Sequence, residues 1–254
     1  MPAMATIMPP AMPMRERPPV GDRALVRLMT WLSPAFPVGA YSYSHGIEAA
    51  VEAGLVRDHA SLADWIAAIL AHGVGRTDAV FVAAAMRAAV GDDPAALDRV
   101  AERATAWRAT AELALESAAE GAAFLQAVRA AWPHPLLDAL AARLTGNDSA
   151  PLSPPAPTYP IAVAAAAAAW SVPEDLTVTA YLQAFSSNLV SAGLRLIPLG
   201  QTDGLKVLAS LEPVIHAVAK EALGMTMDAI GSATLMVDWI SMRHETQYAR
   251  LFRS

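Results

Sequence analysis

The sequence predicts an all-α fold: a single-domain bundle of roughly nine to eleven helices with no significant sheet. Three observations lead to this prediction. The 254-residue chain is 55% hydrophobic, and much of that content is alanine, the residue with the highest helix propensity. Apolar residues recur at helical spacing along most of the chain, and no segment keeps the apolar–polar alternation of a strand. Prolines and glycines separate these stretches, as they do where helices end.

The first helices are bounded by proline and glycine. Leu25, Leu28 and Leu32 fall on one face of a helix that begins near residue 21. That helix ends at 33–39, because this turn holds two prolines and a glycine. A second helix is expected over 41–53, closing at a glycine.

Capping residues mark the next helices. Ser61 begins a segment that resembles a capping box, so we expect it to be the N-cap of the third helix. The run 78–90 continues helical, and Asp93 precedes a proline in the pattern of an N-cap followed by proline at the first helical position. One or two alanine-rich helices should cover 95–131, and a short one 136–144.

The second half of the chain opens with the clearest loop of the sequence. Residues 145–160 are rich in proline and polar residues. After them we expect a buried alanine-rich helix at 161–170 and a long helix from 173 to 198, with acidic residues in its first turn. A further helix should cover 205–223, with Pro213 either kinking or dividing it.

These patterns divide the chain into three parts. Residues 1–20 are rich in methionine and proline, which predicts a disordered leader. Residues 21–231 form the helical domain, with a loop or linker at about 145–160. Residues 232–254 mix large apolar, aromatic and arginine side chains densely. Such a tail either docks on its own core or orders on a partner, because these residue types are enriched at interfaces.

Composition excludes several classes of function. The net charge is −6 and no basic run appears, which argues against nucleic-acid binding. The absence of cysteine excludes disulfides, thiolate metal sites and cysteine nucleophiles. No apolar run approaches the roughly 20 residues that span a bilayer, so we expect a soluble, cytoplasmic protein without membrane contact. Phosphate-loop, dinucleotide, metalloprotease and nucleophile-elbow motifs are missing.

The segment 41–48 is dense in aromatic and polar side chains. In a helix, residues at i, i+3, i+4 and i+7 share one face. Here they are Tyr41, Ser44, His45 and Glu48. The face forms either a polar site beside the preceding turn, or a buried tyrosine-rich helix whose hydroxyls form local hydrogen bonds.

A second constellation lies at 191–204. Arg195 is expected in the last turn of a helix, where a cation is favoured, and the following Pro-Leu-Gly-Gln-Thr-Asp-Gly stretch reads as a connection between helices. That account is purely structural. Its glycines would also permit close approach by a partner chain.

Three long segments carry a resemblance to a known family. They are WLSPAFPVG at 31–39 continued by SYSHGIE at 42–48, LRLIPLGQTDG at 194–204, and SMRHETQYARLFRS at 241–254. Together, and in this order, they resemble the urease accessory protein UreF family, with Ile47 where leucine is more usual. The likeness spans about 24–254.

The resemblance implies an all-helical homodimer that is not an enzyme. It would join a UreD/UreH-type partner and the GTPase UreG in delivering nickel to apo-urease; it would hold no stable cofactor, because nickel is handled by the complex. Docking on the UreD/UreH-type partner would involve the tail residues Arg243, His244, Glu245, Thr246, Gln247, Tyr248 and Arg250. Surfaces facing the dimer, the GTPase or a nickel passage would include Tyr41, Ser42, Tyr43, His45, Glu48, Arg195, Pro198, Gly200 and Gln201.

The leading hypothesis is a non-catalytic scaffold, a nickel-insertion chaperone that dimerises and bridges these partners. The alternative is a GTPase-activating or GTPase-modulating factor that supplies an arginine in trans, since such arginines stabilise phosphoryl-transfer charge. Arg195, Arg243 and Arg250 are the candidates.

Two other hypotheses concern chemistry within the chain. An independent hydrolase could use Ser44, His45 and Glu48, although a nucleophile adjacent to its base on a helix points about 100° away from it. Direct nickel binding would have His45, Glu48 and His244 as candidates. The histidines nowhere form a close His-x-His or His-x-x-x-His pair, so a local metal site is not indicated.

Overall fold

The computed structural model describes residues 22–145 and 157–254. Within these ranges the chain forms eleven α-helices and two short 3-10 helices, with no strand. The prediction of an all-α fold with nine to eleven helices is confirmed. The expected leader at 1–20 and most of the expected linker at 145–160 lie outside the described residues.

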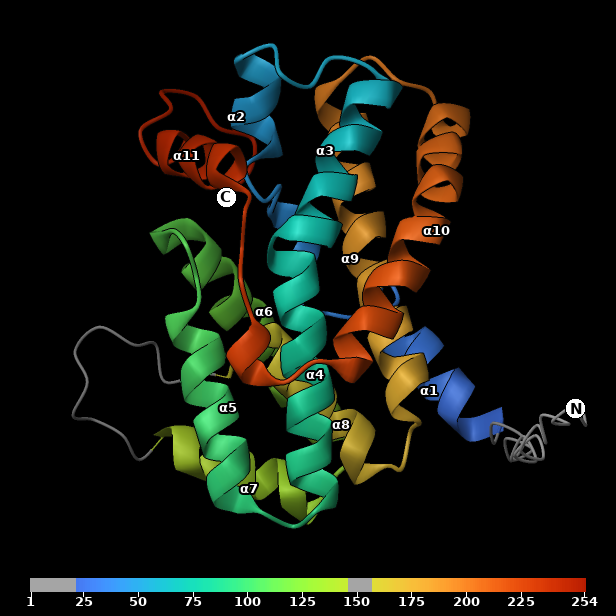
Figure 1. Ribbon diagram of the computed structural model, residues 1–254, viewed down its shortest axis with the longest axis vertical. Helices are drawn as coiled ribbons and strands as arrows, with labels where there is room; N and C mark the ends of the chain where they lie inside the picture. Colours follow the sequence, from blue (N-terminus) through green and yellow to red (C-terminus); the bar gives the residue numbers. More distant parts are fainter. Residues whose placement is uncertain (1–21, 146–156) are drawn as a thin grey trace, which may run out of the picture.

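Figure 1 shows how these helices are arranged. The α-helices are, in chain order, α1 (Asp22–Trp31), α2 (Ile47–Glu52), α3 (His59–His72), α4 (Val74–Val90), α5 (Pro94–Ala106), α6 (Ala111–Ala131), α7 (Pro135–Thr145), α8 (Tyr159–Ala169), α9 (Glu174–Leu196), α10 (Gln201–Gly224) and α11 (Leu235–His244). The 3-10 helices are η1 (Ala40–Ser42) and η2 (Met227–Ala229). Helix α4 lies at the centre, against α3, α5, α8, α9 and α10.

Small residues allow the central helices to approach closely. Residues 161–167 of α8 are all fully buried, and five of the seven are alanine. Gly121 of α6 faces the chain just before α8, where an added Cβ would collide with the carbonyl oxygen of Pro157. The alanine content read from the sequence therefore serves close helix packing.

The start of α3 differs from the prediction. Asp58, not Ser61, is the N-cap, and its side chain accepts a hydrogen bond from the Ser61 amide at 2.8 Å. The Ser61 hydroxyl reaches back to the Asp58 amide at 3.1 Å, so the pair forms a reciprocal capping box. Asp93 does cap α5 as expected, accepting from the Ala96 amide at 2.9 Å.

The predicted helix over 41–53 is wrong in its first half. The segment is η1, then a turn in which His45 (φ 55°) and Gly46 (φ 78°) both take left-handed backbone conformations, and α2 begins only at Ile47. Left-handed residues cannot continue a right-handed helix. Tyr41, Ser44, His45 and Glu48 therefore do not share a helix face.

The longer helical stretches are placed as the sequence indicates, with their ambiguities settled. The stretch 95–131 forms two helices, α5 and α6, and Thr110 caps the second by accepting from the Leu113 amide. Pro213 lies inside α10 without dividing it.

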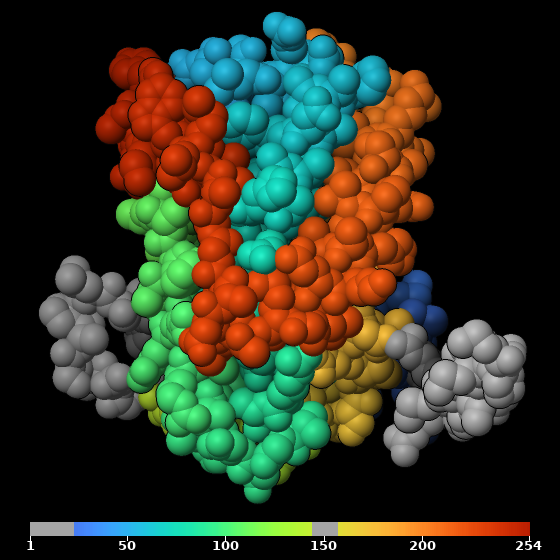
Figure 2. All heavy atoms as spheres, viewed as in Figure 1, coloured from blue at the N-terminus to red at the C-terminus, as the bar shows by residue number. Residues whose placement is uncertain are grey.

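The C-terminal segment lies on the core. After α10 the chain crosses the face of the bundle through η2, and α11 then packs on α2 and α6. Figure 2 shows this red segment covering the surface beside α3 and α4. The Ala233 amide donates to the carbonyl of His72 at 2.8 Å on the way. Of the two interpretations of residues 232–254, the structure thus has the tail docked on its own core.

Within residues 22–145 and 157–254, no single helix is both long and apolar enough to cross a bilayer. Only the bent pair α3 and α4, taken together, meets the length and composition limits.

Candidate functional site

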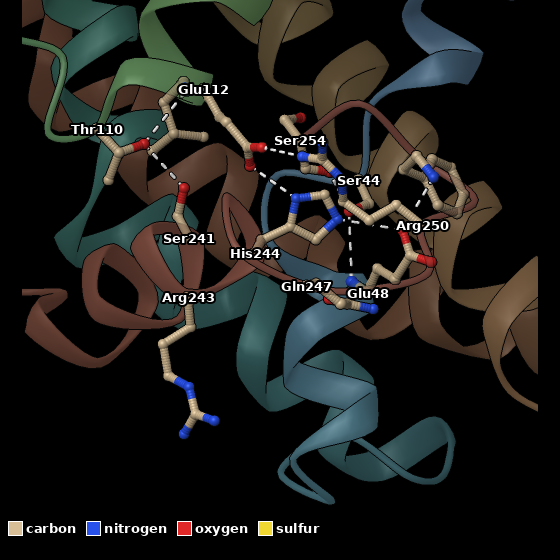
Figure 3. A network of polar contacts seen from close by, with 12 residues as sticks. Ser44, Glu48, Thr110, Glu112, Ser241, Arg243, His244, Gln247, Arg250 and Ser254 are labelled. Carbon is tan, nitrogen blue, oxygen red and sulfur yellow. Dashed lines mark hydrogen bonds and ion pairs between the residues drawn. The ribbon is translucent and has the colours of Figure 1, made fainter.

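A buried polar network fixes the C-terminal segment to the bundle (Figure 3). We call its centre the tail network and define it as Glu48, Glu112, His244 and Arg250. Glu48 comes from the first turn of α2, Glu112 from the first turn of α6, and His244 from the last residue of α11. The network therefore joins three helices that are far apart in the sequence.

His244 lies at the centre of the network and is fully buried. Its Nδ1 is 2.7 Å from Oε2 of Glu112, and its Nε2 is 3.2 Å from Oε2 of Glu48. Both carboxylate side chains are only 9% exposed. Arg250 adds a charged contact of 2.6 Å between its Nη1 and Oε1 of Glu112. Charged hydrogen bonds in such a buried setting are stronger than those at the surface.

Glu48 also binds the backbone that follows Arg250. Its Oε1 accepts from the Leu251 amide at 2.7 Å, and its Oε2 accepts from the Phe252 amide at 2.9 Å. One carboxylate therefore accepts from two backbone amides of the tail and also contacts the ring of His244. The turn at His45 and Gly46 places α2, and with it Glu48, against this segment.

A second set of contacts binds the last two residues. The amide of Ser44 donates to the carbonyl of Ser254 at 2.9 Å, and the amide of Arg253 donates to the carbonyl of Ser42 at 2.8 Å. Glu116 accepts from the Ser254 hydroxyl and also lies 3.1 Å from Nδ1 of His45. Residues 42–45 thus bind the C-terminus, and this pairing explains why the segment is not helical.

Three glutamates follow one face of α6 at a spacing of four residues: Glu112, Glu116 and Glu120, all buried. The first two bind the tail. Burial raises the pKa of the Glu120 carboxyl well above its ordinary value, and the neighbouring Glu116 raises it further. A row of acids at i, i+4 and i+8 in an alanine-rich helix is a signal that sequence reasoning could have used.

A separate buried ion pair joins α4 to the residues between α5 and α6. Nη2 of Arg108 is 2.8 Å from Oδ1 of Asp78, and both side chains are about 95% buried. The hydroxyl of Tyr181 donates to Oδ2 of Asp78 at 2.8 Å. Burial raises the pKa of the Tyr181 hydroxyl well above its ordinary value, and the charge of Asp78 adds to this. For Arg108, burial opposes the charged form, but Asp78 outweighs it and the pKa of the guanidinium is raised.

The residues predicted from segment 41–48 fall in different environments. Tyr41 is 71% exposed, whereas Tyr43 is buried beneath the guanidinium of Arg253. Burial raises the pKa of the Tyr43 hydroxyl. Ser42 takes part in the backbone pairing described above, and His45 and Glu48 bind the tail region. Ser44, His45 and Glu48 therefore anchor the C-terminus, and the segment forms neither a single polar helix face nor a tyrosine-rich helix.

The central segment meets the tail at one point. Arg195, in the last turn of α9 as expected, lies 4.3 Å over the ring of Phe252. Desolvation lowers the pKa of its guanidinium. Pro198, Gly200 and Gln201 are exposed at the junction between α9 and α10.

The predicted docking residues of the tail divide by exposure. His244 points inward and Gln247 is half-buried. The side chain of Arg250 is partly exposed and contacts Glu112. The exposed members are Arg243, Glu245, Thr246 and Tyr248.

The two chemical hypotheses find little support in this geometry. Ser44 binds the carbonyl of Ser254 while His45 faces Glu116, so the two do not form a nucleophile–base pair. Across residues 22–145 and 157–254, no group of three or more His, Asp or Glu side chains is arranged to hold a metal ion. His45, Glu48 and His244 are therefore not identified as metal ligands.

Helix α11 has two faces of opposite exposure. Val237, Ile240, Ser241 and His244 are buried against the bundle. The outer face carries large apolar side chains that are at least 50% exposed: Leu235, Met236, Trp239 and Met242. We call these four residues the outer face of α11. Exposed apolar clusters of this kind mark binding surfaces.

A second exposed apolar surface lies on α1. Leu25, Val26 and Met29 are 52%, 61% and 68% exposed, while the opposite face of the helix is buried. Beside them a groove of about 520 Å³ runs between α1, the 33–38 turn and α9, with Glu116 and Glu120 among its lining residues. The α1 face is therefore a second candidate for contact with another chain.

These features define a class: an all-helical protein whose C-terminal segment is anchored on the bundle by buried carboxylates and presents an apolar face outward. Comparison with known proteins identifies the family within this class. The family model for UreF matches residues 56–212. The chain is 50% identical over 227 residues to the urease accessory protein UreF of Methylobacterium sp. (strain 4-46), covering 89% of this chain and 87% of that protein. It is 52% identical over 231 residues to the protein of that name from Rhodopseudomonas palustris (strain BisB5), covering 91% of each. This chain belongs to the UreF family.

Proposed function

We propose that this protein is a non-catalytic scaffold in urease maturation, which dimerises and bridges a UreD/UreH-type partner and the GTPase UreG during nickel insertion. The observation that carries the proposal is the outer face of α11. An apolar helix face held outward by a buried polar network is a pre-organised binding surface, and pre-organisation reduces the entropy lost on association. Nickel would be the cargo of the assembled complex.

The UreD/UreH-type partner is assigned to the tail. The outer face of α11 offers Trp239, a residue type that dominates binding energy at interfaces, with Arg243 5.1 Å over its ring. Tyr248 and Leu251 extend the exposed surface beyond the helix. The inward residues, His244 above all, support this surface from behind and would contribute to docking indirectly.

We expect Trp239→Ala to weaken binding of the UreD/UreH-type partner by about 30-fold or more, because truncating a central aromatic anchor costs at least about 2 kcal/mol. Affinity would be measured by calorimetry or surface plasmon resonance with the full chain. The matched control is Leu205→Ala, an exposed apolar residue of α10, which should bind as the wild type does. Equal affinity of the Trp239 variant and the wild type would refute the assignment.

The homodimer is assigned to α1. Its exposed apolar residues are adjacent to the groove between α1 and α9, so a second copy that covered this face would bury both features at once. The GTPase would then meet a third surface at the junction from Pro198 to Gln201, because Tyr41 lines the groove and would be covered in the dimer.

We expect Met29→Glu to convert a dimer into a monomer, because it places a charge within an apolar contact. Analytical ultracentrifugation at micromolar concentrations measures the change. Val90→Glu, at an equally exposed apolar position at the end of α4, should leave the dimer intact. A Met29 variant that still dimerised would remove α1 from the interface.

The arginine contacts favour the scaffold over an arginine supplied in trans. Arg250 is bound to Glu112, and Arg195 is stacked on Phe252. Either side chain would have to leave its contact before it could reach a nucleotide. These two arginines are better explained as parts of the tail anchor.

A further inference from the structure

The buried position of His244 fixes the number of protons in the tail network. Each of its two ring nitrogens faces a carboxylate oxygen, one on Glu112 and one on Glu48. An ionised carboxylate only accepts hydrogen bonds, whereas a neutral imidazole has one donor and one acceptor nitrogen. A neutral ring between two ionised carboxylates would therefore leave two acceptors facing each other in a buried site.

Two arrangements remove this conflict, and they contain the same number of protons. In one, His244 is an imidazolium that donates from both nitrogens. In the other, the ring is neutral and one carboxyl group carries the proton. The remaining acceptor positions do not change the count, because they are filled by donors that always carry hydrogen: the amides of Leu251 and Phe252 and the guanidinium of Arg250.

We infer that docking of the C-terminal segment takes up one proton, held among Glu48, His244 and Glu112, so that the docked state weakens as the pH rises. The inference rests on the proposed function, because the docked segment is what presents the outer face of α11 to a partner. It deepens that function by making assembly sensitive to pH.

Other charged groups lie around His244 and define the controls. From α6, Glu116 faces His45 and lies one turn beyond Glu112. On α11 itself, Asp238 is half-buried and its pKa is raised by desolvation, with His45 opposing the rise. Arg243 and Glu245 flank His244 in sequence and are exposed. His45 is a second buried imidazole that faces a carboxylate, that of Glu116, so it provides the matched control.

The direction of the effect follows from proton linkage. In a released tail the imidazole of His244 is exposed, and an exposed imidazole loses its second proton at about pH 6.5. The docked state keeps the proton, so its stabilisation is complete below about pH 6.5 and is lost as the pH rises above it. The equilibrium constant for docking should decrease by up to about tenfold for each pH unit above that value.

Amide hydrogen exchange of the full chain tests this. The amides of Leu251 and Phe252 donate to Glu48, so their protection reports docking directly. After correction for intrinsic exchange, their protection should fall with the stated slope as the pH rises above about 6.5. Glu112→Gln should abolish the slope, because its amide donates to Nδ1 and a neutral ring then satisfies both neighbours; His45→Gln should keep it.

A flat profile in the wild type, or an unchanged slope in Glu112→Gln, would overturn the inference. Should Glu112→Gln fail to fold, Glu48→Gln serves instead: its amide donates to Nε2 of a neutral ring whose Nδ1 donates to Glu112, so the slope should again vanish. The exchange experiment contains no partner. If protection does not depend on pH but the partner still binds, only this inference is refuted. If the partner does not bind but protection falls with pH as stated, only the proposed function is refuted.

Discussion

Glu48→Ala should release the C-terminal segment from the bundle while leaving the helical core folded. The substitution removes the acceptor for two backbone amides and one face of His244. Removing one partner from a buried charged network costs about 3 kcal/mol or more. The protection of the Leu251 and Phe252 amides against exchange should therefore fall more than about 100-fold at constant pH.

The control for this substitution is on the same helix. Glu52 ends α2 and is exposed, so Glu52→Ala should change the protection of these amides by less than about threefold, the usual range for a surface site. If the two amides remained protected in Glu48→Ala, the backbone pairing of residues 42–44 with the C-terminus would be sufficient to hold the tail.

Asp78→Ala should have the largest effect on the stability of the bundle itself. It leaves the guanidinium of Arg108 buried without its counter-ion and the hydroxyl of Tyr181 without its acceptor. Breaking a buried pair from one side costs about 3–5 kcal/mol. For a domain of this size that corresponds to a decrease in Tm of about 10 °C. Urea denaturation and calorimetry measure the two quantities.

An exposed ion pair provides the comparison. Asp228 faces Arg103 at 3.2 Å with its own side chain 93% exposed; Asp228→Ala should cost less than about 0.5 kcal/mol. Replacing both members of the buried pair, as in Asp78→Ala with Arg108→Met, should recover part of the lost stability. A single Asp78→Ala variant as stable as Asp228→Ala would show that Arg108 reaches solvent without cost.

The two predictions concern different layers of one structure. Asp78, Arg108 and Tyr181 hold α4 and α9 to the chain that leads into α6, whereas the tail network holds the C-terminal segment on the surface of that assembly. The first layer should resist release of the tail, because its ion pair and hydrogen bond join Asp78, Arg108 and Tyr181 to one another. Tail release is therefore expected as a local transition with its own free energy.

Local patterns were sufficient where a helix is determined by its own residues. Three such features are the buried apolar face of α1 that contains Leu28, the N-cap at Asp93 and the acidic first turn of α9. Each depends on only a few neighbouring residues, so each can be predicted from the sequence. The prediction failed at 41–46, because that backbone is set by hydrogen bonds to residues more than 200 positions away. No periodicity within the segment encodes those partners.

The site shows the same division. Glu48 and His244 were identified as polar residues in segments rich in aromatic and charged side chains. No local pattern predicts that the two lie within hydrogen-bond distance of each other. Glu112, the second carboxylate that binds His244, was missed, because an acidic residue near the start of a helix usually faces solvent and favours the helix dipole. Its burial follows from the packing of α11 on α6.

By itself the sequence determined the helical class, most helix positions and, through three motifs, the family. These depend on local propensity and on the order of residues along the chain. Only the tertiary structure decided that the tail is docked, that α11 turns its apolar residues outward, and that His244 is enclosed by two carboxylates. Those features depend on which distant segments meet, and buried hydrogen bonds between such segments are specified by the whole fold.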